Sequence, residues 1–325
     1  MFRFVSRRIL WAIPVLIIGS LLMFLALQMT TDPIAAARKH NVTADALTKY
    51  KHDLGLDQSV IQQYWTFLRH FFTGNFGRSF TSQAPVWPEL RTALVNTIVL
   101  GLVAAVFYVT IGVIFGVISA VKQYSVFDHA TTGLSFLGLS LPPFVFGLMC
   151  IVLVGTFYQH TFHTSGVLLP TVGGVYSPQT HGFDLMDRTR HLILPVLVLS
   201  VQEIAIYSRY MRTGMLETLN SDYLRTARAK GISERRVIFR HAFRNALIPL
   251  TTFTAIDLGA LAGGLIITEQ IFGYQGMGLY FVQNYSNADY PALLPWIMIV
   301  IIFVVVFNVL ADLSYAWLDP RIRLD

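Results

Sequence analysis

The sequence has little charge and almost no cysteine. Only 13% of its 325 residues are Asp, Glu, Lys or Arg, whereas 54% are hydrophobic. A water-soluble fold of this length needs a more polar surface, so that class is excluded and an all-α polytopic membrane protein is predicted. The one cysteine, Cys150, has no second cysteine to pair with, so an intrachain disulfide is excluded. We expect Cys150 to be a small buried residue.

The motifs of ATP hydrolysis and of common hydrolases are also missing. A P-loop needs a Gly-Lys pair before Ser or Thr, because the lysine reaches the phosphates, but none of the five lysines follows a glycine. The sequence contains no Gly-x-Ser-x-Gly and no His-Glu-x-x-His motif. His160 and His163 have metal-like spacing, but no nearby carboxylate or cysteine completes a ligand set. We therefore expect a non-catalytic chain with no metal or other cofactor of its own.

Long apolar runs recur along the chain. At 1.5 Å per residue, about 20 helical residues cross a hydrocarbon core of about 30 Å. Six spanning helices are predicted, at about residues 9–29, 94–121, 130–158, 191–211, 246–271 and 292–317. The first is longer than the apolar part of most signal peptides, so we expect it to be retained. The predicted parts are an N-terminal helix at 1–31, an extracytoplasmic segment at 32–91, a five-helix core at 92–317 and a tail at 318–325.

The positive charge is unevenly distributed over this topology. Fifteen of the 24 Lys and Arg fall on one side: three at the N-terminus, Lys122, nine from Arg209 to Arg244, and two in the tail. Basic residues beside apolar spans mark the cytoplasmic side. The net charge of +6 therefore reflects topology and not nucleic-acid binding. We predict a multi-pass protein of the cell membrane with both termini in the cytoplasm.

Four residues inside predicted spans are candidates for a translocation pathway. Glu203 and Asp257 are acidic, and carboxylates deep in a membrane usually face a bundle interior or a wet path. Pro142 and Pro143 interrupt the third span, and a proline pair kinks a helix because backbone hydrogen bonds are lost. The freed carbonyls must then be satisfied by neighbours or by a cavity. For the carboxylates a packing hydrogen bond is the alternative, and for the prolines an ordinary bent helix.

The segment 222–249 is the longest polar stretch between apolar runs in the C-terminal part. Ser221 can cap a first helix, Gly231 can end it in a left-handed turn, and Ser233 can cap a second helix. Two short helices joined by a sharp turn are predicted. Charge alone fits a simple topology signal, but the small residues, the glycine and the proline at the next span suggest a shaped docking surface. The segment has seven basic residues: Arg225, Arg228, Lys230, Arg235, Arg236, Arg240 and Arg244.

The order of residues in this segment resembles the EAA loop of ABC-transporter permeases that work with a solute-binding protein. It is most similar to the B-type subunits of oligopeptide and dipeptide permeases. That loop opens with Glu-Ala-Ala, has a glycine six residues after the Glu, and ends near Leu-Pro. Here Arg225 stands in the Glu position, Thr226-Ala227 follow it, Gly231 has the same spacing, and Ile248-Pro249 close the loop. Both departures are typical of the peptide branch.

The resemblance extends over nearly the whole chain. Residues 54–57, 63–64 and 85–86 are similar to the family's segment after helix one, although Gly74–Gly77 departs from the usual Gly-Asp-Leu-Gly and Ser59 stands where a proline is usual. Residues 269–278 are similar to the outside loop between the last two spans, and 318–323 to the family's ending.

The resemblance implies the MetI-like fold of type I ABC importers, with a cytoplasmic coupling loop at 213–245 and half of a translocation pathway for peptides. Implied partners are a second permease subunit, two ATPase subunits that hold ATP and Mg²⁺, and an extracytoplasmic binding protein. The implied contacts with the ATPase are Asp222, Tyr223, Arg225, Thr226, Ala227, Lys230, Gly231 and Arg235, and those with the binding protein are Gln270, Phe272 and Tyr274.

Two other classes were weighed. A secondary transporter should show internal repeats and paired charges at mid-membrane, and we find no convincing repeat. An intramembrane enzyme lacks a nucleophile with its base. For a permease of this family, the substrate could be a dipeptide, a longer peptide, glutathione or a nickel chelate, and the sequence does not distinguish them. The role of the segment 32–91 is also open: it can be a lid, a docking surface or both.

Overall fold

The computed structural model describes residues 2–30, 48, 51–52, 57–157, 169–176, 184–260 and 265–318. Within these ranges the named elements are all helices, with one isolated bridge between Arg78 and Pro85. They are α1 (Phe2–Thr30), α4 (Val60–Phe72), α5 (Val86–Val121), α6 (Val126–Ser140), α7 (Pro143–Ile151), the π-helix η1 (Val152–Phe157), α9 (Leu185–Leu219), α10 (Asp222–Ala229), α11 (Glu234–Arg236), the π-helix η2 (Val237–Ala242), α12 (Phe243–Ala260), α13 (Ile266–Phe272), α14 (Met277–Ser286) and α15 (Tyr290–Leu318).

Among the residues that the structure describes, four helices are long and apolar enough to cross a membrane: α1, α5, α9 and α15. A fifth candidate is the pair α6 and α7, which is bent by 94° where residues 141–142 separate the two helices. The predicted break at the proline pair is therefore confirmed. The chain is a multi-pass membrane protein.

Two predicted boundaries were wrong. The fifth span, 246–271, is not one helix in the described part of the chain, because α12 ends at Ala260 and α13 begins at Ile266 after a non-helical Leu265. Residues 261–264 lie outside the described ranges. The helix of the second span begins at Val86 and not near 94, because residues 88–92, with the polar Glu89, Arg91 and Thr92, continue the helix beyond its apolar part. Pro88 is tolerated there because the first helical turn has no N–H partner to lose.

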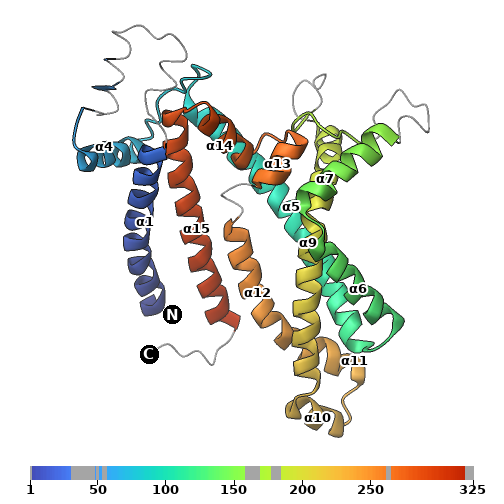
Figure 1. Cartoon of the computed structure of the whole chain (residues 1–325). Coiled ribbons are helices and arrows are strands. Elements are labelled where there is room, and N and C mark those ends of the chain that lie inside the picture. Colours follow the sequence, from blue (N-terminus) through green and yellow to red (C-terminus); the bar gives the residue numbers. More distant parts are fainter. Residues whose placement is uncertain are drawn as a thin grey trace. The chain divides into compact units, whose positions relative to one another are not determined.

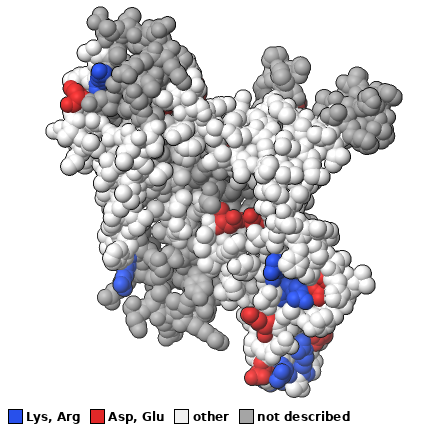
Figure 2. All heavy atoms as spheres, viewed as in Figure 1, with Lys and Arg blue, Asp and Glu red and all other residues white. Residues whose placement is uncertain are grey.

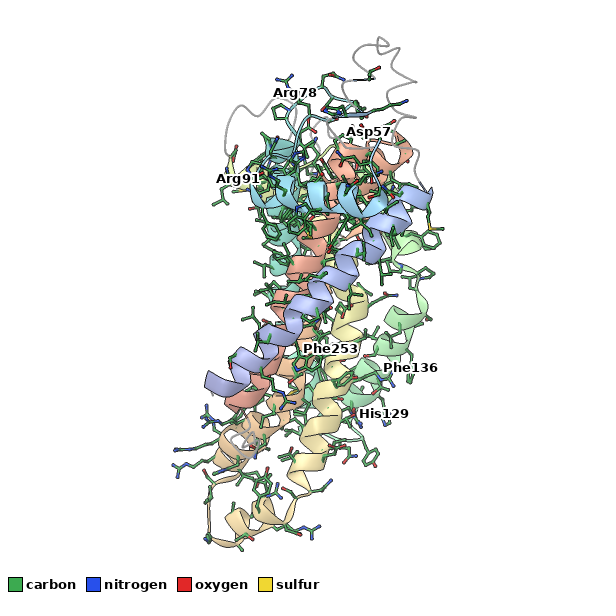
Figure 3. The ribbon with its side chains drawn as sticks, turned by 90° about the vertical axis from the view of Figure 1, so that its left-hand side faces the viewer. Asp57, Arg78, Arg91, His129, Phe136 and Phe253 are labelled. Carbon is green, nitrogen blue, oxygen red and sulfur yellow. The ribbon has the colours of Figure 1, made fainter. Side chains whose placement is uncertain are left out.

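The chain divides into two compact units, which are described separately. Unit 1 comprises Met1–Thr97, Gly259–Ile266 and Gln275–Val309, and unit 2 comprises Ile98–Leu258, Ile267–Tyr274 and Leu310–Asp325. In unit 1, α1 and α15 run side by side and α4 lies across them at one end (Figures 1 and 3).

The core of unit 1 joins α1, α4, α14, α15 and the start of α5. Asp289 is fully buried just before α15 and accepts hydrogen bonds from Ser79 Oγ at 2.6 Å and from the Thr81 N–H at 2.9 Å. The Trp296 indole N–H donates to the Met277 carbonyl at 2.9 Å. A cavity of about 550 Å³ remains between α1, α4, the segment 75–83 and the start of α15.

Unit 2 is built on the close approach of α5 and α9. A Cβ built on Gly112 would lie 2.6 Å from Tyr207 Cβ, and one on Gly116 would lie 2.6 Å from both Met211 Cβ and the Ser208 carbonyl oxygen. Only glycine allows this separation, and the Gly-x-x-x-Gly spacing is the familiar pattern of tightly packed membrane helices. This close packing of α5 and α9 was not predicted from the sequence.

Candidate functional site

The basic segment forms a hairpin at the end of α9. Gly231 has φ +75°, the left-handed conformation that its position predicted. Its N–H donates to the Arg228 carbonyl at 2.9 Å, and the Ile232 N–H donates to the Ala227 carbonyl at 3.3 Å. These two bonds close the end of α10, as expected of a glycine after a helix C-terminus. The predicted sharp turn is confirmed.

The two arms of the hairpin differ from the prediction. Ser221 occupies the N-cap position of α10, but its hydroxyl donates to the Thr218 carbonyl at 2.5 Å and makes no cap bond, and Ser233 makes none either. The second arm is not a short helix, because α11, η2 and α12 follow one another without a break to Ala260. Residues 234–248 contain no glycine or proline that would end a helix. The hairpin is therefore directly continuous with the helix that bears Asp257.

One ion pair joins the arms of the hairpin. Arg228 makes two hydrogen bonds to the Glu234 carboxylate, Nη2 to Oε1 at 2.9 Å and Nε to Oε2 at 3.1 Å. This contact holds the pKa of Glu234 below its ordinary value and raises the pKa of Arg228. Both side chains are largely exposed, so the pair stabilises the turn only weakly, by at most about 1 kcal/mol. Leu224 and Val237, which are fully buried, hold the arms in place.

The outward side of the hairpin carries the residues that the resemblance implies for ATPase coupling. Asp222, Tyr223, Arg225, Thr226, Lys230, Gly231 and Arg235 are exposed, and Ala227 is half-buried. Lys, Arg, Asp and Glu gather at this end of unit 2 (Figure 2). Tyr223 and Phe239 add exposed aromatic surface, and the Tyr223 hydroxyl accepts a hydrogen bond from Asn245 Nδ2 at 2.7 Å. A mixed charged and aromatic surface of this kind fits a protein partner.

Replacing Gly231 by alanine is expected to loosen the hairpin by about 1 kcal/mol, which is the cost of holding an L-residue in the left-handed region. A Cβ at this position would meet nothing within 4 Å, so backbone strain is the whole effect. Hydrogen exchange of residues 222–236 should become about fivefold faster. Gly231→Asn should change it less, because asparagine tolerates this conformation. Equal protection in wild type and Gly231→Ala would contradict the prediction.

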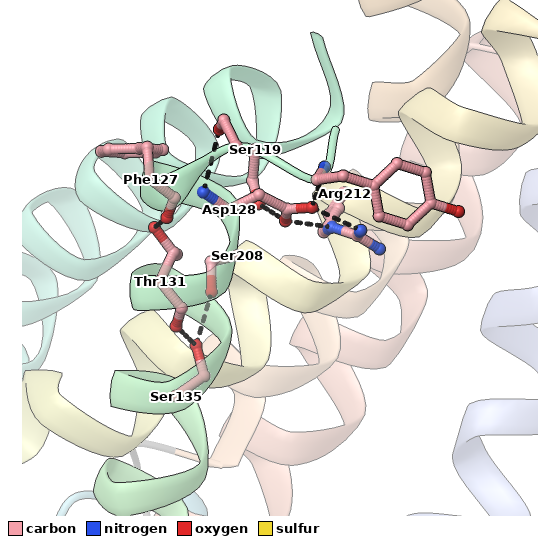
Figure 4. Close-up of polar contacts among 9 residues, drawn as sticks. Ser119, Phe127, Asp128, Thr131, Ser135, Ser208 and Arg212 are labelled. Atoms are coloured by element: carbon pink, nitrogen blue, oxygen red, sulfur yellow. Dashed lines mark hydrogen bonds and ion pairs between the residues drawn. The ribbon is translucent and has the colours of Figure 1, made fainter. Parts of the chain in front are cut away.

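A buried ion pair fixes the base of unit 2 above the hairpin. Arg212 of α9 donates from Nε to Asp128 Oδ1 at 2.7 Å and from Nη2 to Oδ2 at 2.9 Å (Figure 4). Asp128 also accepts from the Ser119 hydroxyl and, at 3.0 Å, from the Tyr124 N–H. Tyr124 has φ 63°, an unfavourable backbone conformation that this bond helps to hold. The Asp128 carboxylate thereby ties together α5, α6 and α9.

The structure brings the acidic pathway candidates together. The hydroxyls of Tyr108 on α5 and Tyr207 on α9 both donate to Asp257 Oδ2 on α12, the second at 3.2 Å. Glu203 lies four residues before Tyr207 on α9 and so is on the same face of that helix. Phe253, labelled in Figure 3, packs against Tyr207 with ring centroids 5.2 Å apart. Three helices of unit 2 therefore meet at one half-buried acidic cluster.

The proline break lies beside this cluster in the fold. Gln202, next to Glu203, donates from Nε2 to the Leu141 carbonyl at 3.0 Å. Leu141 immediately precedes Pro142, so a neighbouring helix satisfies a carbonyl at the break, as the sequence analysis required. Pro142 is the N-cap of α7 and Pro143 begins that helix.

The three residues expected to contact a binding protein belong to the segment 269–278 that was predicted as an outside loop, and they lie in and after α13. Gln270 is exposed, whereas Phe272 and Tyr274 are buried, so only Gln270 presents its side chain for direct contact in this conformation. The Gly173 N–H donates to the Phe272 carbonyl at 3.3 Å, which ties residues 171–176 to this turn. Burial raises the pKa of Tyr274 to about 12, although the positive charge of Arg188 acts to lower it. His160, His163 and the tail after Leu318 lie outside the described residues.

Comparison with known proteins covers the whole chain. Residues 112–324 match the model of the binding-protein-dependent transport system inner membrane component, and residues 1–113 match that of its N-terminal region. The chain belongs to this transport family. It is 36% identical to the oligopeptide transport system permease protein AppB of Bacillus subtilis, over 98% of this chain and 99% of that protein. It is 35% identical to the dipeptide transport system permease protein DppB of Escherichia coli K12, over 99% of both chains. It is 32% identical to the glutathione transport system permease protein GsiC of Escherichia coli O1:K1, again over 99% of both.

Members of this family are membrane components of transport systems, so the hairpin and the acidic cluster are parts of a transport protein. The sequence analysis had assigned both Glu203 and Asp257, but it missed their partners. Nothing in the sequence singles out Tyr108, Asp128 or Arg212, because their roles arise from contacts between helices.

Proposed function

We propose that this chain is the permease subunit of an ATP-driven importer and forms half of a translocation pathway for peptides delivered by a solute-binding protein. The hairpin carries the proposal: it is an exposed, shaped surface directly continuous with α12 and its acidic cluster. The relatives named for oligopeptide and dipeptide transport support peptides as the substrate class.

The proposed topology has six spans with both termini in the cytoplasm. The bent pair α6 and α7 with η1 forms the third span, and α12 forms the fifth. The basic hairpin then lies in the cytoplasm, as basic residues beside spans usually do. Its partners are two ATPase subunits, which bind ATP and Mg²⁺, and a second permease subunit completes the pathway.

The coupling mechanism follows from helix continuity. Asp257 lies 14 residues after Phe243, where α12 begins, a distance of about 21 Å along a helix. Gly214 of α9 lies against Ala246, since a Cβ there would sit 3.6 Å from Ala246 Cβ. A shift of the hairpin driven by the ATPases is transmitted along α12 to the cluster, and the proline break beside Gln202 is the point at which α6 and α7 can reorient. Such a transition requires two states that nucleotide favours unequally.

Copurification from the native membrane in mild detergent tests this function. A second permease and an ATPase should copurify with the wild-type chain. Arg225→Glu with Ala229→Trp changes only exposed residues of α10 and should reduce ATPase recovery more than tenfold while keeping the second permease. Thr189→Trp with Arg190→Glu is the matched control, because both residues are exposed at the other end of α9.

The acidic cluster is a feature that favours a secondary transporter, because gradient-driven carriers use deep carboxylates. Purified chain that moves peptide in liposomes on an ion gradient, without ATP or a second subunit, would overturn the importer proposal.

A further inference from the structure

Helix α4 carries an exposed apolar stripe that was not predicted from the sequence. Ile61, Trp65 and Phe72 are 79%, 70% and 75% exposed, whereas this class of residue is usually buried. Their spacing of four and seven residues places all three on one face of the helix. Three large apolar side chains exposed on one helix face indicate an interaction surface.

The other apolar face of α4 fixes its depth along α1. The Tyr64 hydroxyl donates to the Ile17 carbonyl at 3.1 Å and lies 2.7 Å from Ser20 Oγ. Phe67 stacks on Phe24 with ring centroids 5.7 Å apart. These contacts are made along the side of α1 and not above its end.

The depth of these contacts follows from helix geometry. Ser20 and Phe24 lie ten and six residues before Thr30, the last residue of α1, or about 15 and 9 Å along the helix. The apolar stretch of α1 continues to Thr30. A helix whose side chains reach this part of a spanning segment lies beside the apolar stretch of α1, at the level of the lipid and not in the water beyond it.

The surroundings of α4 at this end of unit 1 also fit a membrane boundary. Asp57, Arg78 and Arg91 lie at this end (Figure 3), and Arg69 lies in the last turn of α4. Trp and Arg are common at membrane–water interfaces, where the indole sits among headgroups and a basic side chain reaches the phosphates.

We propose that α4 is an interfacial helix whose stripe of Ile61, Trp65 and Phe72 contacts bilayer lipid at the end of unit 1 distant from the N-terminus. Under the proposed topology this is the extracytoplasmic leaflet. Helix α4 thereby anchors the extracytoplasmic segment after α1 to the membrane surface. The proposal concerns lipid contact alone and stands whether or not the transported substrate is a peptide.

Spin labelling in lipid nanodiscs tests the proposal on the full chain purified with its partner subunits. In a Cys150→Ala background, single cysteines at 61, 65 and 72 probe the stripe. Cysteines at Gln62 and Thr73 are exposed controls, each about 60° or more around the helix from every residue of the stripe. All five positions are exposed, so the fold is preserved. Collision of each nitroxide with oxygen, which partitions into lipid, is compared with collision with a water-soluble nickel chelate.

The three stripe labels should collide more with oxygen than with nickel, and the ratio should invert at the two controls. Stripe labels that collide mainly with nickel would show a water-exposed face and overturn the proposal. Labels shielded from both reagents would show a protein partner on this face and would also overturn it. Transport activity of the unlabelled variants, measured in parallel, separates either failure from a failure of the proposed function.

Discussion

Replacing Asp128 by alanine is expected to lower the free energy of unfolding by about 3 kcal/mol and to abolish transport. Removal of one partner of a buried ion pair typically costs about 3–5 kcal/mol, because the other charge is left unpaired. Only 3% of the Asp128 side chain is exposed, but 28% of Arg212 is, so the lower end of that range applies. The substitution also removes the acceptor of the strained Tyr124 N–H. Thermal unfolding in detergent with its partner subunits measures the effect.

Two further variants distinguish an unpaired charge from general damage. Asp128→Ala with Arg212→Ala should recover part of the lost stability, because no unpaired guanidinium remains. Asp184→Ala removes an exposed N-cap that accepts from the Met186 N–H at 2.8 Å, and should cost about 1 kcal/mol. An Asp128→Ala protein no less stable than Asp184→Ala would show that the ion pair does not fix the base of unit 2.

Replacing Gly116 by leucine is expected to prevent assembly of a functional unit 2. The added Cβ would lie 2.6 Å from the Ser208 carbonyl oxygen, and backbone cannot move aside as the end of a flexible side chain can. Overpacking typically costs about 1–3 kcal/mol, and a clash with backbone along a helix seam lies at or above the upper limit. Separation of α5 from α9 would also pull Tyr108 and Tyr207 apart, and both bind Asp257. The amount of monodisperse protein in detergent and its peptide uptake in vesicles are the measurements.

Gly133 of α6 offers the matched control for this experiment. A Cβ built there meets nothing within 4 Å, so Gly133→Leu adds the same side chain to a helical glycine without a clash. Its yield and transport should equal those of the wild type. A Gly116→Leu protein that behaves like Gly133→Leu would disprove the close seam between α5 and α9.

Several features followed from the sequence because they depend on the backbone of one or two residues. Gly231 was predicted to adopt a left-handed conformation, and Pro142-Pro143 to break a helix, because glycine and proline alter the allowed φ and the hydrogen bonding wherever they occur. Apolar run length identified α1, α5, α9 and α15 as spans, since a bilayer sets that length. The same rule gave poor boundaries at Val86 and Ala260, because polarity marks where lipid ends and not where a helix ends.

Tertiary structure alone decided which side chains meet. Asp128 pairs with a residue 84 positions away, and Asp257 with a tyrosine 149 positions away. In membrane helices that are apolar on every side, the 3.6-residue period does not show which face packs inward, so partners across helices cannot be read from it. The sequence by itself determined the membrane class, the basic hairpin and the deep carboxylates. Helix packing brought Asp257 to α5 and α9. The continuity of the second hairpin arm with α12 is local instead, because residues 234–248 contain no glycine or proline.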